Sequence, residues 1–148
     1  MSDQSEKFVV IAEKIHKTYR TGRMEVPVLH GVDFKVARGE MVVVMGSSGC
    51  GKTTLLNCLS GLDNVDSGVI KIGGINLAGM SDTEKTNYRA QRMGYIFQAY
   101  NLLPVLTAAE NVELPLLLSG TGSRLARSSA LESLDLVNLA ERAEHYPS

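Results

Sequence analysis

Residues 41–54 have the sequence Met41-Val42-Val43-Val44-Met45 followed by Gly46-Ser47-Ser48-Gly49-Cys50-Gly51-Lys52-Thr53-Thr54. The second part matches G-x-x-x-x-G-K-[ST], the motif of a phosphate-binding loop between a strand and a helix. A plain glycine-rich turn has no need of Gly, Lys and Thr at these fixed offsets. The first part is apolar at every position, which predicts a strand covered on both faces in a central parallel sheet.

Each part of this loop has a chemical role in holding phosphate. Glycines let several backbone N–H groups converge on one anion, and the following helix adds its positive dipole end. Lys52 supplies an ammonium for the β- and γ-phosphates, Thr53 a hydroxyl ligand for Mg²⁺, and Thr54 a contact toward the α-phosphate. The predicted nucleotide-binding residues of the loop are Gly46, Ser47, Ser48, Gly49, Cys50, Gly51, Lys52, Thr53 and Thr54.

Composition narrows the possible partners and locations. The chain has 148 residues, of which 44% are hydrophobic, enough to form a core. Its net charge of −1, with interspersed signs, provides no basic face, so we expect no nucleic acid partner. No apolar stretch approaches the roughly 20 residues of a membrane helix, and residues 1–7 lack the pattern of a secretory signal. We therefore expect a cytoplasmic location.

Strand patterns surround the loop. Residues 8–11 are apolar, and residues 32–36 alternate between apolar and polar side chains, which predicts half-buried antiparallel strands. Residues 69–75 contain two β-rich pieces around Gly73-Gly74, the composition of a hairpin turn. A further strand is expected at residues 94–97, ending at Gln98.

Helix patterns follow the loop and dominate the end of the chain. After the loop, leucines at helical spacing predict a helix that stops near Gly61. Two capping boxes mark the starts of later helices, the first of which extends to about Arg92. The residues that carry these patterns are Leu55, Leu59 and Leu62, then Ser81 with Glu84, then Thr107 with Glu110, and finally the stripe of Ala126, Ala130, Leu134 and Val137.

These elements together predict an α/β fold. The expected architecture is a P-loop NTPase core of the RecA-like kind with an antiparallel β layer, followed by the start of a helical subdomain. We assign residues 1–98 to the nucleotide-binding core and residues 99–148 to the start of the helical subdomain.

Three segments together resemble the ATP-binding subunit of ABC transporters. They are Lys17-Thr18-Tyr19, the phosphate loop, and residues 95–104, Tyr-Ile-Phe-Gln-Ala-Tyr-Asn-Leu-Leu-Pro. The resemblance covers nearly the whole chain. Residues 64–68 and 106–116 are similar to the branch of this family that serves lipoprotein release and macrolide export.

The resemblance implies roles for two residues outside the loop. In such subunits an aromatic residue ahead of the loop stacks on adenine, and the matching position here is Tyr19. A ring suits that role because stacking tolerates any flat base. The resemblance also implies that Gln98 ligates Mg²⁺ and contacts the attacking water, so Lys52 and Gln98 are the expected catalytic residues and Thr53 and Gln98 the metal ligands.

The same resemblance implies cofactors and partners. ATP and Mg²⁺ would be bound, a second copy would complete each site, and a membrane-spanning permease would dock on residues 100–113. The protein would then lie at the cytoplasmic, inner face of the cell membrane. The transported cargo is not implied, because the permease selects it.

Several parts of such a subunit are not found in the sequence. No run of four apolar residues beyond Lys52 is followed by Asp, so no Walker B motif is visible; Asp135 comes closest but follows a helical pattern. The family's signature motif and switch histidine are also missing. We therefore expect an incomplete cassette that ends before the signature, with part of its core uncovered and no appreciable hydrolysis by these residues alone.

The sequence leaves two other functions open. The first alternative is a naturally truncated, non-hydrolysing nucleotide-binding module. ATP binding without hydrolysis would fit this module and the transporter subunit alike. A small nucleotide kinase would need acceptor-binding arginines and a lid, and Arg124 and Arg127 are too isolated to indicate either.

Overall fold

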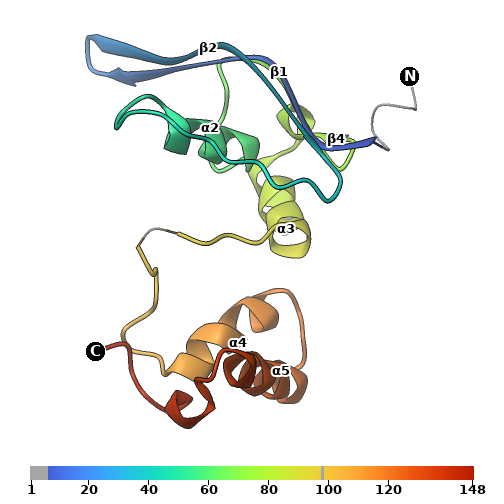
Figure 1. Ribbon diagram of the computed structural model, residues 1–148, viewed down its shortest axis with the longest axis vertical. Helices are drawn as coiled ribbons and strands as arrows, with labels where there is room; N and C mark the ends of the chain where they lie inside the picture. Colours follow the sequence, from blue (N-terminus) through green and yellow to red (C-terminus); the bar gives the residue numbers. More distant parts are fainter. Residues whose placement is uncertain (1–6, 98) are drawn as a thin grey trace. The chain divides into compact units, whose positions relative to one another are not determined.

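The computed structural model describes residues 7–97 and 99–148. These residues form two compact units, the first ending at Arg89 and the second beginning at Ala90 (Figure 1). The sequence-based division between a core at 1–98 and a helical part at 99–148 stays a prediction.

A four-stranded sheet forms the body of the first unit. Its strands are β1 (Phe8–Thr21), β2 (Met24–Ala37), β3 (Ser67–Ile72) and β4 (Ile75–Asn76), in the order β2-β1-β3-β4 with every neighbouring pair antiparallel. The antiparallel layer predicted from the sequence is confirmed, and its first two strands are longer than expected.

The turn between β3 and β4 follows the predicted hairpin chemistry. Gly73 and Gly74 have φ of 55° and 83°, the left-handed conformation that two-residue hairpin turns require at both positions. The pairs Lys71 with Asn76 and Ile72 with Ile75 close the hairpin. The Gly-Gly dipeptide is therefore the local cause of this turn.

Two predicted strands are wrong in this structure. Residues 41–45, directly before the loop, and residues 94–97 form no strand. Met41, Val43 and Met45 are 92%, 71% and 85% exposed. A strand exists only through hydrogen bonds to a neighbour, and no described segment pairs with either stretch. The central parallel sheet is accordingly absent from the described residues.

Helix α2 (Lys52–Leu59) packs one face against the sheet. Leu55, Cys58 and Leu59 are buried, as the leucine spacing predicts, and Gly61 follows in the left-handed conformation. Leu62 is 48% exposed, so its predicted place in the apolar stripe is wrong, because the helix has ended before it.

Helix α3 (Asp82–Arg92) is held to the first unit by polar contacts. Its predicted capping box is present, with the Ser81 N–H donating to Glu84 and the Glu84 N–H to the Ser81 hydroxyl. Further along, the Tyr88 hydroxyl donates to the Ile72 carbonyl and Arg89 to the Gly61 carbonyl. A short 3₁₀ turn, η1 (Leu77–Gly79), leads into this helix.

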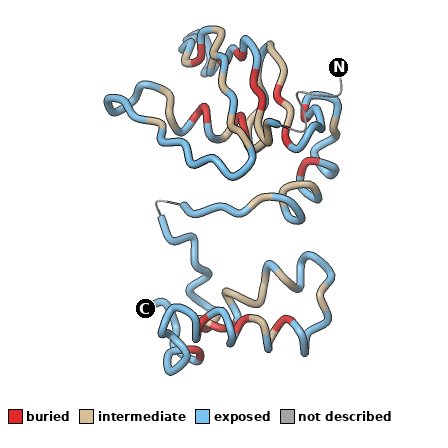
Figure 2. Tube along the Cα trace, turned by 45° about the vertical axis from the view of Figure 1, so that its right-hand side comes forward, coloured by how far each residue is buried: buried red, intermediate tan, exposed pale blue. Residues whose placement is uncertain are grey.

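The second unit is built on the helix pair α4 (Ala108–Leu118) and α5 (Ser123–Leu136), followed by the 3₁₀ turn η2 (Ala140–Arg142). Thr107 and Glu110 form the predicted capping box. The buried apolar residues lie along these helices and the turn after them (Figure 2): Ala109, Ala126, Ala130, Leu134 and Ala143. Val137 is 61% exposed at the end of α5, so its place in the predicted stripe is wrong.

No helix in the described ranges combines the length and the hydropathy that crossing a bilayer would need.

Gly68 is the position where the sheet tolerates a side chain least. A Cβ there would lie 2.6 Å from the Lys14 carbonyl oxygen and 2.7 Å from that of Glu13, and φ is +100°. We expect Gly68→Ala to lower the free energy of unfolding of the first unit by about 2–4 kcal/mol, since both strain and backbone displacement are involved. Urea denaturation measures this. Gly79→Ala, whose Cβ meets nothing within 4 Å, is the control, and equal stability of the two variants would contradict the prediction.

Candidate nucleotide-binding site

The predicted phosphate loop turns tightly ahead of α2. Gly49 and Gly51 have φ of 80° and 96°, and Gly51 is the N-cap of the helix. A Cβ on Gly51 would lie 3.0 Å from Val28 Cγ1, so the loop passes close over β2 at this point. Glycine is required there both by the backbone conformation and by the space available.

Lys52 folds back over the loop that precedes it. Its Nζ donates to the Gly46 carbonyl at 3.0 Å and to the Ser47 carbonyl at 2.7 Å, and lies 3.7 Å from Cys50 Sγ. The loop is thus curled around one ammonium group. A positive charge held in this way at a helix N-terminus suits an incoming phosphate.

The two threonines after Lys52 face different surroundings. Thr53 is exposed, and Thr54 is buried at 9% exposure. The N–H groups in the first turn of α2 have no partner within the helix, so they can point toward an anion. The Thr53 hydroxyl is therefore available to a metal ion that accompanies a phosphate, which fits bound Mg²⁺ and ATP.

Tyr19 lies next to α2, where it contacts Thr54. A residue that contacts the base of a bound nucleotide has to lie near the phosphate loop, which α2 follows directly. Its side chain is 39% exposed, and its hydroxyl donates to Asp63 Oδ2 at 2.8 Å. A hydrogen bond with Thr54 lowers the pKa of Tyr19, but the hydrogen bond to Asp63, burial and the Asp63 charge together raise that pKa above its ordinary value. Tyr19 and the loop helix are thus brought together.

A partly buried ion pair supports Tyr19. Lys17 Nζ donates to Asp63 Oδ1 at 2.6 Å and to the Asn64 carbonyl at 2.7 Å. Burial raises the pKa of Asp63, but the hydrogen bonds from Lys17 and Tyr19 outweigh it and hold that pKa below its ordinary value. Burial lowers the pKa of Lys17, and its bond to Asp63 more than compensates, so that pKa is raised.

Sequence reasoning assigned no role to Lys17 or Asp63. A signal was present: Lys17 lies two residues after the apolar Ile15 on the same face of a strand, and a lysine on a buried face needs a charged partner. The identity of that partner, 46 positions away in the sequence, could not be read from the pattern.

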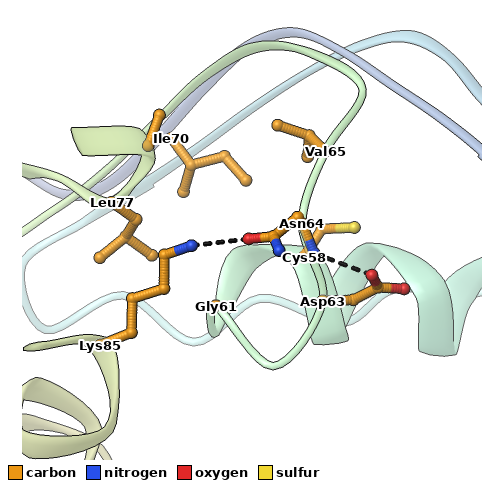
Figure 3. Close-up of a pocket in the computed structure, with 9 residues that line it drawn as sticks. Cys58, Gly61, Asp63, Asn64, Val65, Ile70, Leu77 and Lys85 are labelled. Carbon is orange, nitrogen blue, oxygen red and sulfur yellow. Dashed lines mark hydrogen bonds between the residues drawn. The ribbon is translucent and has the colours of Figure 1, made fainter. Parts of the chain in front are cut away.

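A small cavity adjoins the ion pair. It has a volume of about 30 Å³ and lies between the end of α2, β3 and α3 (Figure 3). Lys85, 9% exposed, reaches into it and donates to Asn64 Oδ1 at 2.6 Å. The space suits a water molecule and is too small for a nucleotide.

The segment expected to dock on a permease is held by one side chain. Gln98, the predicted metal ligand that precedes this segment, lies outside the described residues. Asn111 Nδ2 donates to the carbonyls of Leu103, Leu106 and Thr107 at 3.1, 3.0 and 2.9 Å, and its Oδ1 accepts from the Leu103 N–H at 2.8 Å. The apolar side chains that this arrangement leaves most exposed are Tyr100, Leu102 and Val105.

The curled loop, its lysine and the neighbouring tyrosine define a P-loop nucleotide-binding domain. Solved structures agree: a TM-score of 0.85 and 37% identity relate this chain to the dimeric post-hydrolysis state of the ATP-binding cassette MJ0796 bound to ADP and Pi, over 93% of this chain and 61% of that one. The family model described as ABC transporter matches residues 29–147. The chain belongs to the ABC transporter family.

Curated relatives point to one branch of that family. The lipoprotein-releasing system ATP-binding protein LolD of Xanthomonas campestris pv. campestris is 45% identical over 140 residues, 95% of this chain and 59% of that protein. LolD of Porphyromonas gingivalis is 43% identical over 140 residues, again 95% of this chain, and 62% of its own length. The chain therefore spans about three-fifths of the relatives that it matches.

The ion pair predicts how stability depends on pH. Because the folded-state pKa of Asp63 is lowered, its charge stabilises the fold above the ordinary value of 3.8, and this contribution is lost as the pH falls through the lowered value. We expect Asp63→Asn to cost about 1–3 kcal/mol at neutral pH and less at pH 3, measured by urea denaturation. Glu13→Gln, which changes an exposed carboxylate on β1, the strand that carries Lys17, is the control. A cost for Asp63→Asn that is the same at both pH values would contradict this assignment.

Proposed function

We propose that this chain binds the triphosphate of ATP at residues 46–54, as part of the ATP-binding subunit of an ABC transporter of the lipoprotein-releasing kind. The observation that carries the proposal is the Lys52 ammonium, curled into its own loop at the start of α2. The similarity to LolD over 95% of the chain supports the branch.

In this proposal the chain's own groups act through charge and position. The Lys52 ammonium offsets the negative charge that develops on the γ-phosphate, and loop N–H groups orient the tail. When bound, Mg²⁺ would supply positive charge to the phosphates, and the residues proposed to hold it are Thr53, through its hydroxyl, and Gln98. Tyr19 provides a partly exposed ring on which the adenine stacks. Hydrolysis is proposed for the whole protein.

We further propose that the protein works at the cytoplasmic face of the membrane with two partners. One is a second copy, which would complete each nucleotide site. The other is a membrane-spanning permease, which would dock on residues 100–113. Support comes from the exposed apolar side chains of Tyr100, Leu102 and Val105 and from the way Asn111 fixes the neighbouring loop.

The first test removes the ammonium. Lys52→Ala should weaken the binding of ATP and Mg²⁺ about 10- to 100-fold, because a charge-assisted contact to phosphate is lost. Isothermal titration calorimetry measures the affinity. Lys35→Ala, an exposed lysine on β2, is the matched control and should bind as the unchanged protein does. Equal affinity of Lys52→Ala and Lys35→Ala would refute the proposed site.

The second test addresses docking. Val105 is 77% exposed, so Val105→Asp should leave the fold and ATP binding intact while placing a charge in the proposed interface. Co-purification with the permease should fall about tenfold or more, since a charge in an interface core is poorly tolerated. Leu125→Asp, an exposed position on α5, is the control. Retained co-purification of the Val105 variant would remove residues 100–113 as the docking surface.

A further inference from the structure

We propose that Asp63, together with Lys17, positions the Tyr19 ring and thereby sets the affinity of the site for the base of the nucleotide. The inference rests on the proposed function, since it assigns Tyr19 to the base. It makes Asp63 and Lys17 positioning residues, because they act through Tyr19.

The two oxygens of the Asp63 carboxylate have separate partners. Oδ2 accepts from the Tyr19 hydroxyl at 2.8 Å, and Oδ1 accepts from Lys17 Nζ at 2.6 Å. Lys17 Nζ also lies over the Tyr19 ring, 5.0 Å from its centroid. The ring is therefore held at its hydroxyl end and on one face, which restricts the rotation of a side chain that would otherwise turn freely at the surface. A base can stack only on the opposite face.

The position of Asp63 relative to the phosphate loop is set by α2. The N–H groups of Leu62 and Asp63 both donate to the Asn57 carbonyl, at 2.9 and 3.1 Å, so Asp63 is fixed to the last turn of the helix. The first turn of the same helix begins at Lys52. At 1.5 Å per residue, its 8 residues place the two ends about 12 Å apart. One short, rigid element thus separates the group that holds phosphate from the group that holds the ring.

Stability alone does not account for the Tyr19 contact. Lys17 is 9% exposed, and burying its ammonium would be costly without the Asp63 carboxylate beside it. Tyr19 is 39% exposed, and a hydroxyl at that exposure can bond to water with little loss. Sharing the carboxylate with Tyr19 therefore gives the fold little, whereas it orients a ring that also contacts Thr54 in the first turn of α2.

The experiment separates the base from the phosphates. Tyr19→Phe keeps the ring and removes its tether, and Asp63→Ala removes the anchor. In the protein at its natural full length, calorimetry would compare MgATP with magnesium tripolyphosphate, which has no base. We expect each variant to bind MgATP about three- to tenfold more weakly and tripolyphosphate within about twofold of the unchanged protein. The double variant should bind MgATP no more weakly than Asp63→Ala, because both changes break one contact.

Matched controls account for the loss of a hydroxyl or a charge elsewhere. Tyr146→Phe removes an exposed phenol, and Glu13→Ala removes an exposed carboxylate from β1; both should bind MgATP normally. If the unchanged protein binds neither ligand, the proposed function fails and the inference fails with it. If the unchanged protein binds both ligands, two results would overturn the positioning role alone. In the first, Tyr19→Phe and Asp63→Ala bind MgATP normally. In the second, their affinity for tripolyphosphate falls as much as their affinity for MgATP.

Discussion

The ion pair between Lys17 and Asp63 constrains how the strands and helices of the first unit pack together. Lys17 lies on the buried face of β1, where an unpaired charge would be costly, and the carboxylate that balances it comes from the segment after α2. The pair therefore ties β1, one of the two inner strands of the antiparallel sheet, to the end of the helix that carries the phosphate loop. Because Asp63 also bonds Tyr19, the same interaction joins the packing of the unit to the geometry of its candidate site.

Local sequence patterns predicted the local structure well. Alternating residues at 32–36 and the Gly73-Gly74 turn led to the antiparallel strands, and the two capping boxes marked the starts of α3 and α4. The prediction failed at residues 41–45 and 94–97. Their composition is that of covered strands, but pairing depends on a neighbour, and no described segment supplies one. Leu62 and Val137 failed for a simpler reason, because each lies just beyond the end of its helix.

The sequence predicts the part of the candidate site that consists of consecutive residues. It does not indicate the residues whose partners lie far away along the chain. Spacing alone predicted the loop and Lys52 as the phosphate site, since the motif is read within nine consecutive positions. Tyr19 was located by family resemblance, and the structure places it beside Thr54. Asp63 and Lys85 gave no local signal, because their partners, Lys17 and Asn64, are 46 and 21 positions away. Long-range polar pairs of this kind are visible only in three dimensions.

Residues near the end of the described chain form hydrogen bonds with the first turn of α4. The Ala108 N–H donates to the His145 carbonyl at 2.8 Å, and the Ala109 N–H donates to the Ala143 carbonyl at 2.9 Å, so two donors of the first helical turn depend on residues 143–145. Asn111, on that same turn, holds the loop at 103–107. A displacement of the backbone at His145 would therefore weaken the hydrogen bonds at the start of α4. Through Asn111 it would also loosen the loop at 103–107, so residues 143–145 and 103–107 are mechanically coupled.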